Sequence, residues 1–264
     1  SINENEKIGV IGVNGMGKST LLKIVAGIEE SDAGTISMGN QVKICYLPQT
    51  PVFEAGTTIL RAATEGNYDE LNRWTIEAEA KSMLNQLGFT DYDEKIEHMS
   101  GGQKKRVALV RALLTPADIL VLDEPTNHLD NEMSEWLEEY LIQFRGAILM
   151  VTHDRYFLDR VVNRIVEVDH GKLYNYPGNY SEFVRLKAER QNMELATERK
   201  RKSLLRTELE WLHRGARARS TKQKAHIDRI HAMQEMKDIQ EEKRVMLDSV
   251  ASRMGNKTIE LSEI

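Results

Sequence analysis

The stretch that decides the fold is residues 118–130, DILVLDEPTNHLD. Its apolar run at residues 119–122 predicts a short strand that is buried on both faces. The strand ends in Asp123 and Glu124, so two carboxylates lie at its carboxyl end, which is where ligands bind in an open α/β sheet. Pro125 ends the strand because it fixes φ and has no N–H to donate. Taken alone, these carboxylates fit a solvated turn equally well.

A glycine-rich motif upstream favours a binding site instead. Residues 12–19, GVNGMGKS, match G-x-x-x-x-G-K-[ST], the phosphate-binding P-loop. The flanking sequence predicts a strand before it and a helix after it, as the motif requires. Glycines let backbone N–H groups turn toward phosphate oxygens, and the helix N-terminus adds a positive dipole end. Lys18 is expected to contact the β- and γ-phosphates, Ser19 to bind Mg2+, and Asp123 to complete the metal site. These features indicate a nucleotide triphosphatase.

A third motif, SGGQ at residues 100–103, precedes the buried strand. As structure alone it predicts a helix that is capped near Ser100 and turns an apolar face toward a core, through Val107, Val110, Leu113 and Leu114.

The order of the motifs over residues 1 to about 175 resembles that of ATP-binding cassette (ABC) proteins. Between the P-loop and SGGQ, a glutamine follows a strand (Gln49 in CYLPQ), and after DEP a histidine follows another (His153 in ILMVTHD). The resemblance implies an α/β fold with an ABC-type P-loop core and a helical signature subdomain. It also implies an ATP hydrolase whose cofactors are ATP and Mg2+.

The resemblance assigns roles to the motif residues. Glu124 would be the general base, His153 would contact the γ-phosphate, and Gln49 would sense that phosphate and touch Mg2+. Asp123 would act on the metal through its water. In the family, Ser100 and Gly102 close over ATP bound at the other cassette of a head-to-tail pair, so a second cassette is an expected partner. The positions expected to bind ATP are Gly12, Asn14, Gly15, Gly17, Lys18, Ser19, Thr20, Ser100, Gly101, Gly102 and Gln103.

The helical subdomain is expected at about residues 60–115. A helix is predicted over residues 71–87, with Gly88 as its C-cap and Trp74 as a packing residue more than a binding platform. Only 51 positions separate Gln49 from Ser100. That is too few for the arm that some cassettes insert there, unless an arm was left out of the sequence.

Composition sets further bounds. The 264 residues allow two modules, and no apolar run approaches about 18 residues, so no membrane segment is predicted. No signal peptide is visible, and Cys45, the single cysteine, excludes a disulfide framework and fits a core strand. We therefore expect a cytoplasmic protein. No aromatic residue precedes Gly12, so the strands that carry an adenine platform are expected to be missing from the N-terminus.

Charge divides the chain at about residue 180. The cassette, residues 1–180, has 17 basic and 27 acidic residues, whereas residues 181–264 have 19 and 14. Residues 181–255 predict two helices with a break at Gly215, an antiparallel helical hairpin. A solvated coiled coil explains the helices but not the basic tip. Spaced arginines suit phosphate oxygens, so a nucleic-acid backbone is the expected partner of the tip residues Arg214, Arg217, Arg219, Lys222 and Lys224.

The tail, together with Asn127-His128, resembles the ABC-F family, in which a basic linker joins two cassettes. The chain would be the first cassette plus linker, and residues 256–264 would begin the second cassette. The resemblance implies a factor that binds the ribosome, with rRNA or tRNA as partners, and acts in translation or in protection from antibiotics. A DNA-associated ABC ATPase and the detached ATPase subunit of a transporter stay open as alternatives. We expect weak hydrolysis from the fragment alone, and its self-pairing stays open.

Overall fold

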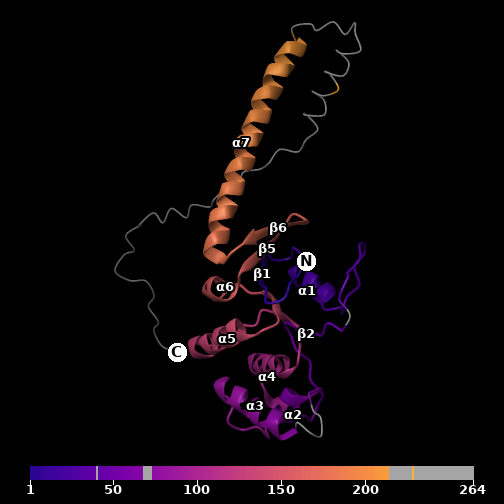
Figure 1. The fold of residues 1–264 in the computed structure, drawn as a ribbon, viewed down its shortest axis with the longest axis vertical. Coiled ribbons are helices and arrows are strands. Elements are labelled where there is room, and N and C mark those ends of the chain that lie inside the picture. Colours follow the sequence, from indigo (N-terminus) through magenta and orange to yellow (C-terminus); the bar gives the residue numbers. More distant parts are fainter. Residues whose placement is uncertain (40, 68–72, 214–227, 229–264) are drawn as a thin grey trace, which may run out of the picture. The chain divides into compact units, whose positions relative to one another are not determined.

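The computed structural model describes residues 1–39, 41–67, 73–213 and 228 (Figure 1). The chain divides into two units, residues 1–188 and residues from 189 onward. The motifs discussed above up to His153 all lie in the first unit.

The first unit is built on a six-stranded sheet with the order β2-β3-β4-β1-β5-β6. Neighbouring strands from β2 to β5 are parallel, and β6 pairs with β5 in an antiparallel hairpin. The α/β fold and the predicted strands around residues 7–11, 45 and 119–122 are confirmed. The strands are β1 (Lys7–Gly12), β2 (Ile44–Leu47), β3 (Ile119–Asp123), β4 (Ala147–Val151), β5 (Arg164–Asp169) and β6 (Lys172–Pro177).

Helices cover both faces of this sheet. Because strand side chains alternate, Val121 and Leu149 join Leu22 of α1 in one core, whereas Leu120 and Ile148 join α4, α5 and α6 in the other. The helices are α1 (Lys18–Val25), α2 (Ile59–Thr64), α3 (Arg73–Gln86), the 3-10 helix η1 (Ile96–His98), α4 (Gly101–Leu114), α5 (Asn131–Gln143), α6 (Arg155–Val161) and α7 (Tyr180–His213).

Helices α2, α3 and α4 pack against one another in the predicted helical region. Ala80, Met83 and Leu84 are buried, and Gly88 follows α3 with a φ of 80°, as predicted for its C-cap. The prediction that Trp74 packs is wrong, because its side chain is 82% exposed. Trp74 and Met83 are nine residues, or about two and a half helical turns, apart, so they point to opposite sides of α3.

Helix α7 confirms the first helix of the predicted hairpin. Its first turns belong to the first unit, where Lys187 forms an ion pair of 2.6 Å with the buried Glu167 of β5. The hydroxyl of Tyr176 donates to the same carboxylate at 3.1 Å. The break at Gly215, nearly all of the second helix and residues 256–264 lie outside the described residues. No helix in the described part is long and apolar enough to cross a membrane.

Candidate active site

The predicted catalytic and metal residues follow the carboxyl ends of neighbouring strands. In the order β2, β3, β4, β1 these ends lead to Gln49, to Asp123 and Glu124, to His153, and to the P-loop. Because the four strands are parallel, the four segments leave the sheet at the same edge, where α/β proteins bind ligands. The topology therefore gathers residues that lie far apart in the sequence.

The P-loop folds around its own lysine. The Lys18 ammonium is buried and donates to the carbonyl oxygens of Gly12 at 2.8 Å and Val13 at 3.2 Å, and to Oδ1 of Asn14 at 3.4 Å. Gly12 lies so close to β5 that a Cβ there would be 2.5 Å from the carbonyl oxygen of Val168. Only glycine fits at this position.

Helix α1 begins without a side-chain cap. Its N-cap is Gly17, whose φ of 85° lies in the left-handed region that suits glycine. No acidic side chain stands in the first turn, which holds Ser19 and Thr20. The first backbone N–H groups of α1 are therefore available to an anion, as expected for a phosphate site.

Two carboxylates occupy the end of β3. Asp123 is 2% exposed and Glu124 is 5% exposed. The backbone N–H of Glu124 donates to the carbonyl of Val151 at 2.8 Å, and its φ of 53° is left-handed. That conformation is rare for a residue other than glycine.

These carboxylates have unused acceptors. Oδ1 of Asp123 and Oε2 of Glu124 are buried and have no hydrogen-bond partner among the described residues. Such atoms are rare in folded proteins and fit the water shell of a bound Mg2+ ion. The described part of the chain has no cluster of three or more His, Cys, Asp or Glu side chains that could hold a metal.

His153 lies beside Glu124, with Nε2 of the ring 3.4 Å from Oε1 of the carboxylate. Burial raises the pKa of Glu124, and the nearby imidazole partly opposes that increase. A carboxylate with a raised pKa is a stronger base. The segment around His153 is held by Thr152, whose hydroxyl contacts that of Thr126 at 2.7 Å and accepts from the N–H of Asp154 at 3.1 Å.

The signature motif caps α4 through a reciprocal pair of hydrogen bonds. Ser100 Oγ accepts from the N–H of Gln103 at 3.3 Å, and Gln103 Oε1 accepts from the N–H of Ser100 at 2.9 Å. The predicted cap is confirmed, and Gly101 and Gly102 form the first turn of the helix. Helix α4 packs on α2, α3 and β2, whereas α1 packs on β1, β3 and β4. Figure 1 shows α1 and α4 well apart, so the motif belongs to a different region from the P-loop.

Sequence reasoning missed Lys105. Its side chain is 3% exposed, and Nζ donates to the carbonyl oxygens of Pro48 at 2.5 Å and Asp123 at 2.6 Å. Burial lowers the pKa of Lys105 to about 8. The available signal was its position on α4, four residues before the buried Leu109 and hence on the same face.

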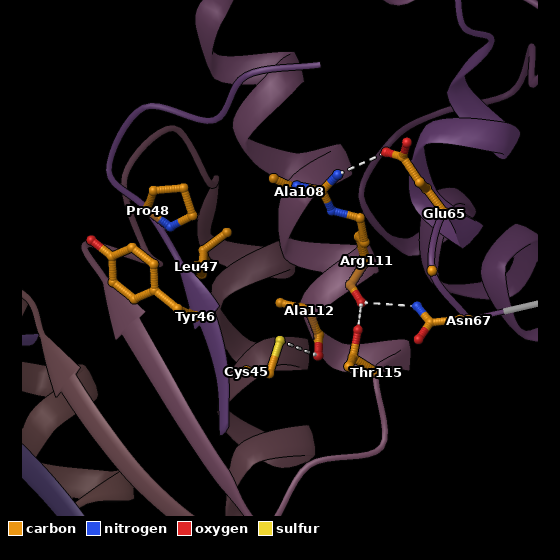
Figure 2. A pocket seen from close by; sticks show the side chains of 11 residues that line it. Cys45, Tyr46, Leu47, Pro48, Glu65, Asn67, Ala108, Arg111, Ala112 and Thr115 are labelled. Carbon is orange, nitrogen blue, oxygen red and sulfur yellow. Dashed lines mark hydrogen bonds and ion pairs between the residues drawn. The ribbon is translucent and has the colours of Figure 1, made fainter. Parts of the chain in front are cut away.

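A small cavity of about 220 Å³ lies between β2, α4 and the end of α2 (Figure 2). At its rim Arg111 forms an ion pair of 3.0 Å with Glu65. The thiol of Cys45 faces the carbonyl oxygen of Ala112 at 3.6 Å, and burial raises its pKa. Cys45 is half-buried and packs against the core from β2, close to its predicted place in a core strand.

The predicted nucleic-acid contacts are not part of the described structure. They are Arg214, Arg217, Arg219, Lys222 and Lys224, and all five lie outside the described residues.

The fold and the site define an ABC-type ATPase cassette. Two family models described as ABC transporter match residues 1–127 and 166–248. An uncharacterized ABC transporter ATP-binding protein of Bacillus subtilis, YfmR, is 43% identical over 100% of this chain and 48% of its own length. The energy-dependent translational throttle protein EttA of Haemophilus influenzae is 36% identical over 98% of this chain and 53% of its own.

The chain belongs to the ABC-F family. It spans about half the length of the curated relatives that it matches. Among solved structures, the complex of an archaeal ribosomal stalk protein with the ribosome recycling factor aABCE1 matches with a TM-score of 0.58 and 31% identity. That match covers 71% of this chain and 37% of the other.

Proposed function

We propose that this chain is the ATP-hydrolysing cassette of a cytoplasmic translation factor that acts on the ribosome. The observation that carries the enzymatic part is the order of strands β2-β3-β4-β1, which brings the glutamine, the two carboxylates, the histidine and the P-loop to one edge of the sheet. The unpartnered buried oxygens of Asp123 and Glu124 support a polar ligand at this edge.

The chemistry follows from the positions of these groups. Lys18 and the N–H groups of α1 would bind the phosphates, and Ser19, Gln49 and Asp123 would hold Mg2+. A bound Mg2+ ion neutralises charge that develops on the phosphates. Glu124 would accept a proton from the attacking water, because its raised pKa makes it a stronger base than an exposed glutamate. His153 would contact the γ-phosphate from beside that base.

Complete hydrolysis would need a second cassette. In this unit the signature helix α4 packs away from α1, which follows the P-loop. A site that uses both motifs therefore takes SGGQ from another cassette. The length of the curated relatives, about twice that of this chain, leaves room for one in the same protein. The isolated chain would accordingly hydrolyse ATP weakly.

The ribosomal part of the proposal is supported by the relatives. EttA is named as a translational throttle protein, and aABCE1 is named as a ribosome recycling factor. The basic tip at residues 214–224 would contact rRNA or tRNA phosphates. We propose a role in translation in general, and protection of ribosomes from antibiotics as a more specific form of that role.

The test is co-sedimentation of the whole protein carrying Glu124→Gln with ribosomes, with and without ATP, at near-physiological salt. ATP-dependent binding that is lost when Arg214, Arg217 and Arg219 are changed to serine would support the proposal. Absence of binding in every nucleotide state would reject it. Preferential binding to duplex DNA, or to a membrane protein complex, would favour the two alternatives instead.

A further inference from the structure

We propose that Lys105 is a positioning residue that fastens both halves of the catalytic machinery to the signature helix. The inference rests on the ATPase function proposed above. It follows from which backbone atoms Lys105 contacts.

The two acceptors of Lys105 stand next to two predicted catalytic residues. The carbonyl of Pro48, 2.5 Å from Nζ, belongs to the residue before Gln49. The carbonyl of Asp123, 2.6 Å from Nζ, belongs to the residue before Glu124. One ammonium group therefore holds the chain directly ahead of the γ-phosphate sensor and directly ahead of the general base.

Lys105 acts where the sheet itself provides no link. The last registered pair between β2 and β3 is Leu47 with Leu122. Beyond it, Pro48 has no N–H with which to continue the ladder. Lys105 replaces the next backbone hydrogen bond between these strands, because its Nζ joins the carbonyls of Pro48 and Asp123, one residue past the last pair.

A lysine is a costly way to fill this space. Removing an ammonium group from water is unfavourable unless hydrogen bonds replace its hydration, and an apolar side chain of similar length would pack there without that penalty. The side chain is 3% exposed and uses its charge on two main-chain oxygens. The advantage of lysine over methionine at this position is therefore that its ammonium fixes the positions of these two main-chain oxygens.

The third attachment point of Lys105 is α4 itself. Its Cα lies five residues after Ser100, on the helix whose first turn is the signature motif. A shift of α4, such as a partner cassette would impose on SGGQ, is passed by Lys105 to the carbonyls of Pro48 and Asp123. Closure of the paired cassettes would thereby set the positions of Gln49 and Glu124.

Lys7 provides a matched control within the same unit. It is also a buried lysine whose Nζ donates to two carbonyls, those of Phe144 and Gly146, the latter at 2.8 Å. Lys7 stands at the first residue of β1, the opposite end of that strand from the P-loop. Loss of Lys7 removes the same kind of interaction without touching the catalytic edge.

The experiment measures steady-state ATP turnover by the whole protein and its Lys105→Met, Lys105→Arg and Lys7→Met variants, with thermal melting of each. We expect Lys105→Met to lower kcat by about 10- to 100-fold, the range for a small misplacement of catalytic groups, while KM for ATP changes less than about threefold. Lys105→Arg should recover part of kcat, since it keeps a cationic donor. Lys7→Met makes the same kind of change away from the catalytic edge and should leave kcat unchanged.

These measurements distinguish failure of the proposed role of Lys105 from failure of the proposed ATPase function. A kcat within twofold of wild type in Lys105→Met would overturn the inference, and so would equal losses of kcat in Lys105→Met and Lys7→Met. If Lys105→Met does not fold, Lys105→Gln, which keeps a neutral N–H donor, replaces it under the same criteria. Absence of turnover in the wild-type protein would instead reject the proposed ATPase function.

Discussion

Glu124 and His153 lie 3.4 Å apart, from Oε1 of a buried carboxylate to Nε2 of an exposed imidazole. They come from the ends of neighbouring strands, β3 and β4, and the N–H of Glu124 is tied to the carbonyl of Val151 on that neighbour. The position of Glu124, the proposed general base, is thus set by the strand that leads to the histidine.

The first prediction concerns the base. Changing Glu124 to Gln keeps the shape of the side chain and removes its ability to accept a proton. We expect kcat of the whole protein to fall by about 10²- to 10⁴-fold, the usual contribution of a positioned base. ATP binding, measured by equilibrium titration with a fluorescent ATP analogue, should stay within about threefold of wild type. Undiminished turnover would exclude Glu124 as the base.

The second prediction concerns Lys18, whose ammonium contacts the P-loop carbonyls of Gly12 and Val13. Replacement by Ala should weaken ATP binding by about 10- to 100-fold, because charged hydrogen bonds contribute roughly 1.5–3 kcal/mol. Lys23→Ala, on the same helix, is the control, since Lys23 forms only an exposed ion pair with Glu29. Isothermal titration of both variants checks this, and equal affinities would contradict the role of Lys18.

The third prediction concerns pH. Burial lowers the pKa of Lys7 from 10.5 to about 8. Between these values the folded protein binds fewer protons than the unfolded chain, so the free energy of unfolding increases as the pH rises from about 8 to 10.5. In Lys7→Met this contribution, up to about 3 kcal/mol, is absent. Urea unfolding should show that the free energy of unfolding increases more between pH 8 and pH 10 for wild type than for Lys7→Met. Equal increases in the two proteins would contradict the lowered pKa of Lys7.

The fourth prediction concerns the base of α7. Lys187→Met removes a charged partner of the buried Glu167 carboxylate and should lower the free energy of unfolding by roughly 2 kcal/mol. Arg185→Met is the matched control, because its ion pair with Glu182 is exposed and should contribute nothing measurable. Chemical unfolding compares the two variants. A loss from Arg185→Met as large as that from Lys187→Met would refute a special role for the buried pair.

Much of the site could be predicted because its residues follow buried strands. A continuous apolar run such as residues 119–122 identifies a strand covered on both faces, and the polar residue that ends it must then lie at a sheet edge. Gln49 and His153 were expected at the site only from their places in the motif order that resembles ABC proteins. The capping role of Ser100 followed from a local pattern of four residues, which needs no tertiary information.

The misses have tertiary causes. Trp74 has helical spacing to apolar residues, but which side of a helix is covered depends on the neighbouring helices. Lys105 was missed because lysine is seldom buried, and its acceptors lie 57 and 18 positions away along the chain. The left-handed backbone of Glu124 likewise depends on its bond to Val151 of another strand.

The edge position of β2 has a mechanical consequence. This strand has four residues and pairs with β3 alone, whereas β3, β4 and β1 each have a strand on both sides. The segment that leads to Gln49 is therefore joined to the sheet on one side only, whereas the strands that lead to the carboxylates and the P-loop are joined on both. A force on Gln49 would therefore reach the carboxylates from one side of β2, through its pairing with β3 and through the contacts of Lys105 with Pro48 and Asp123.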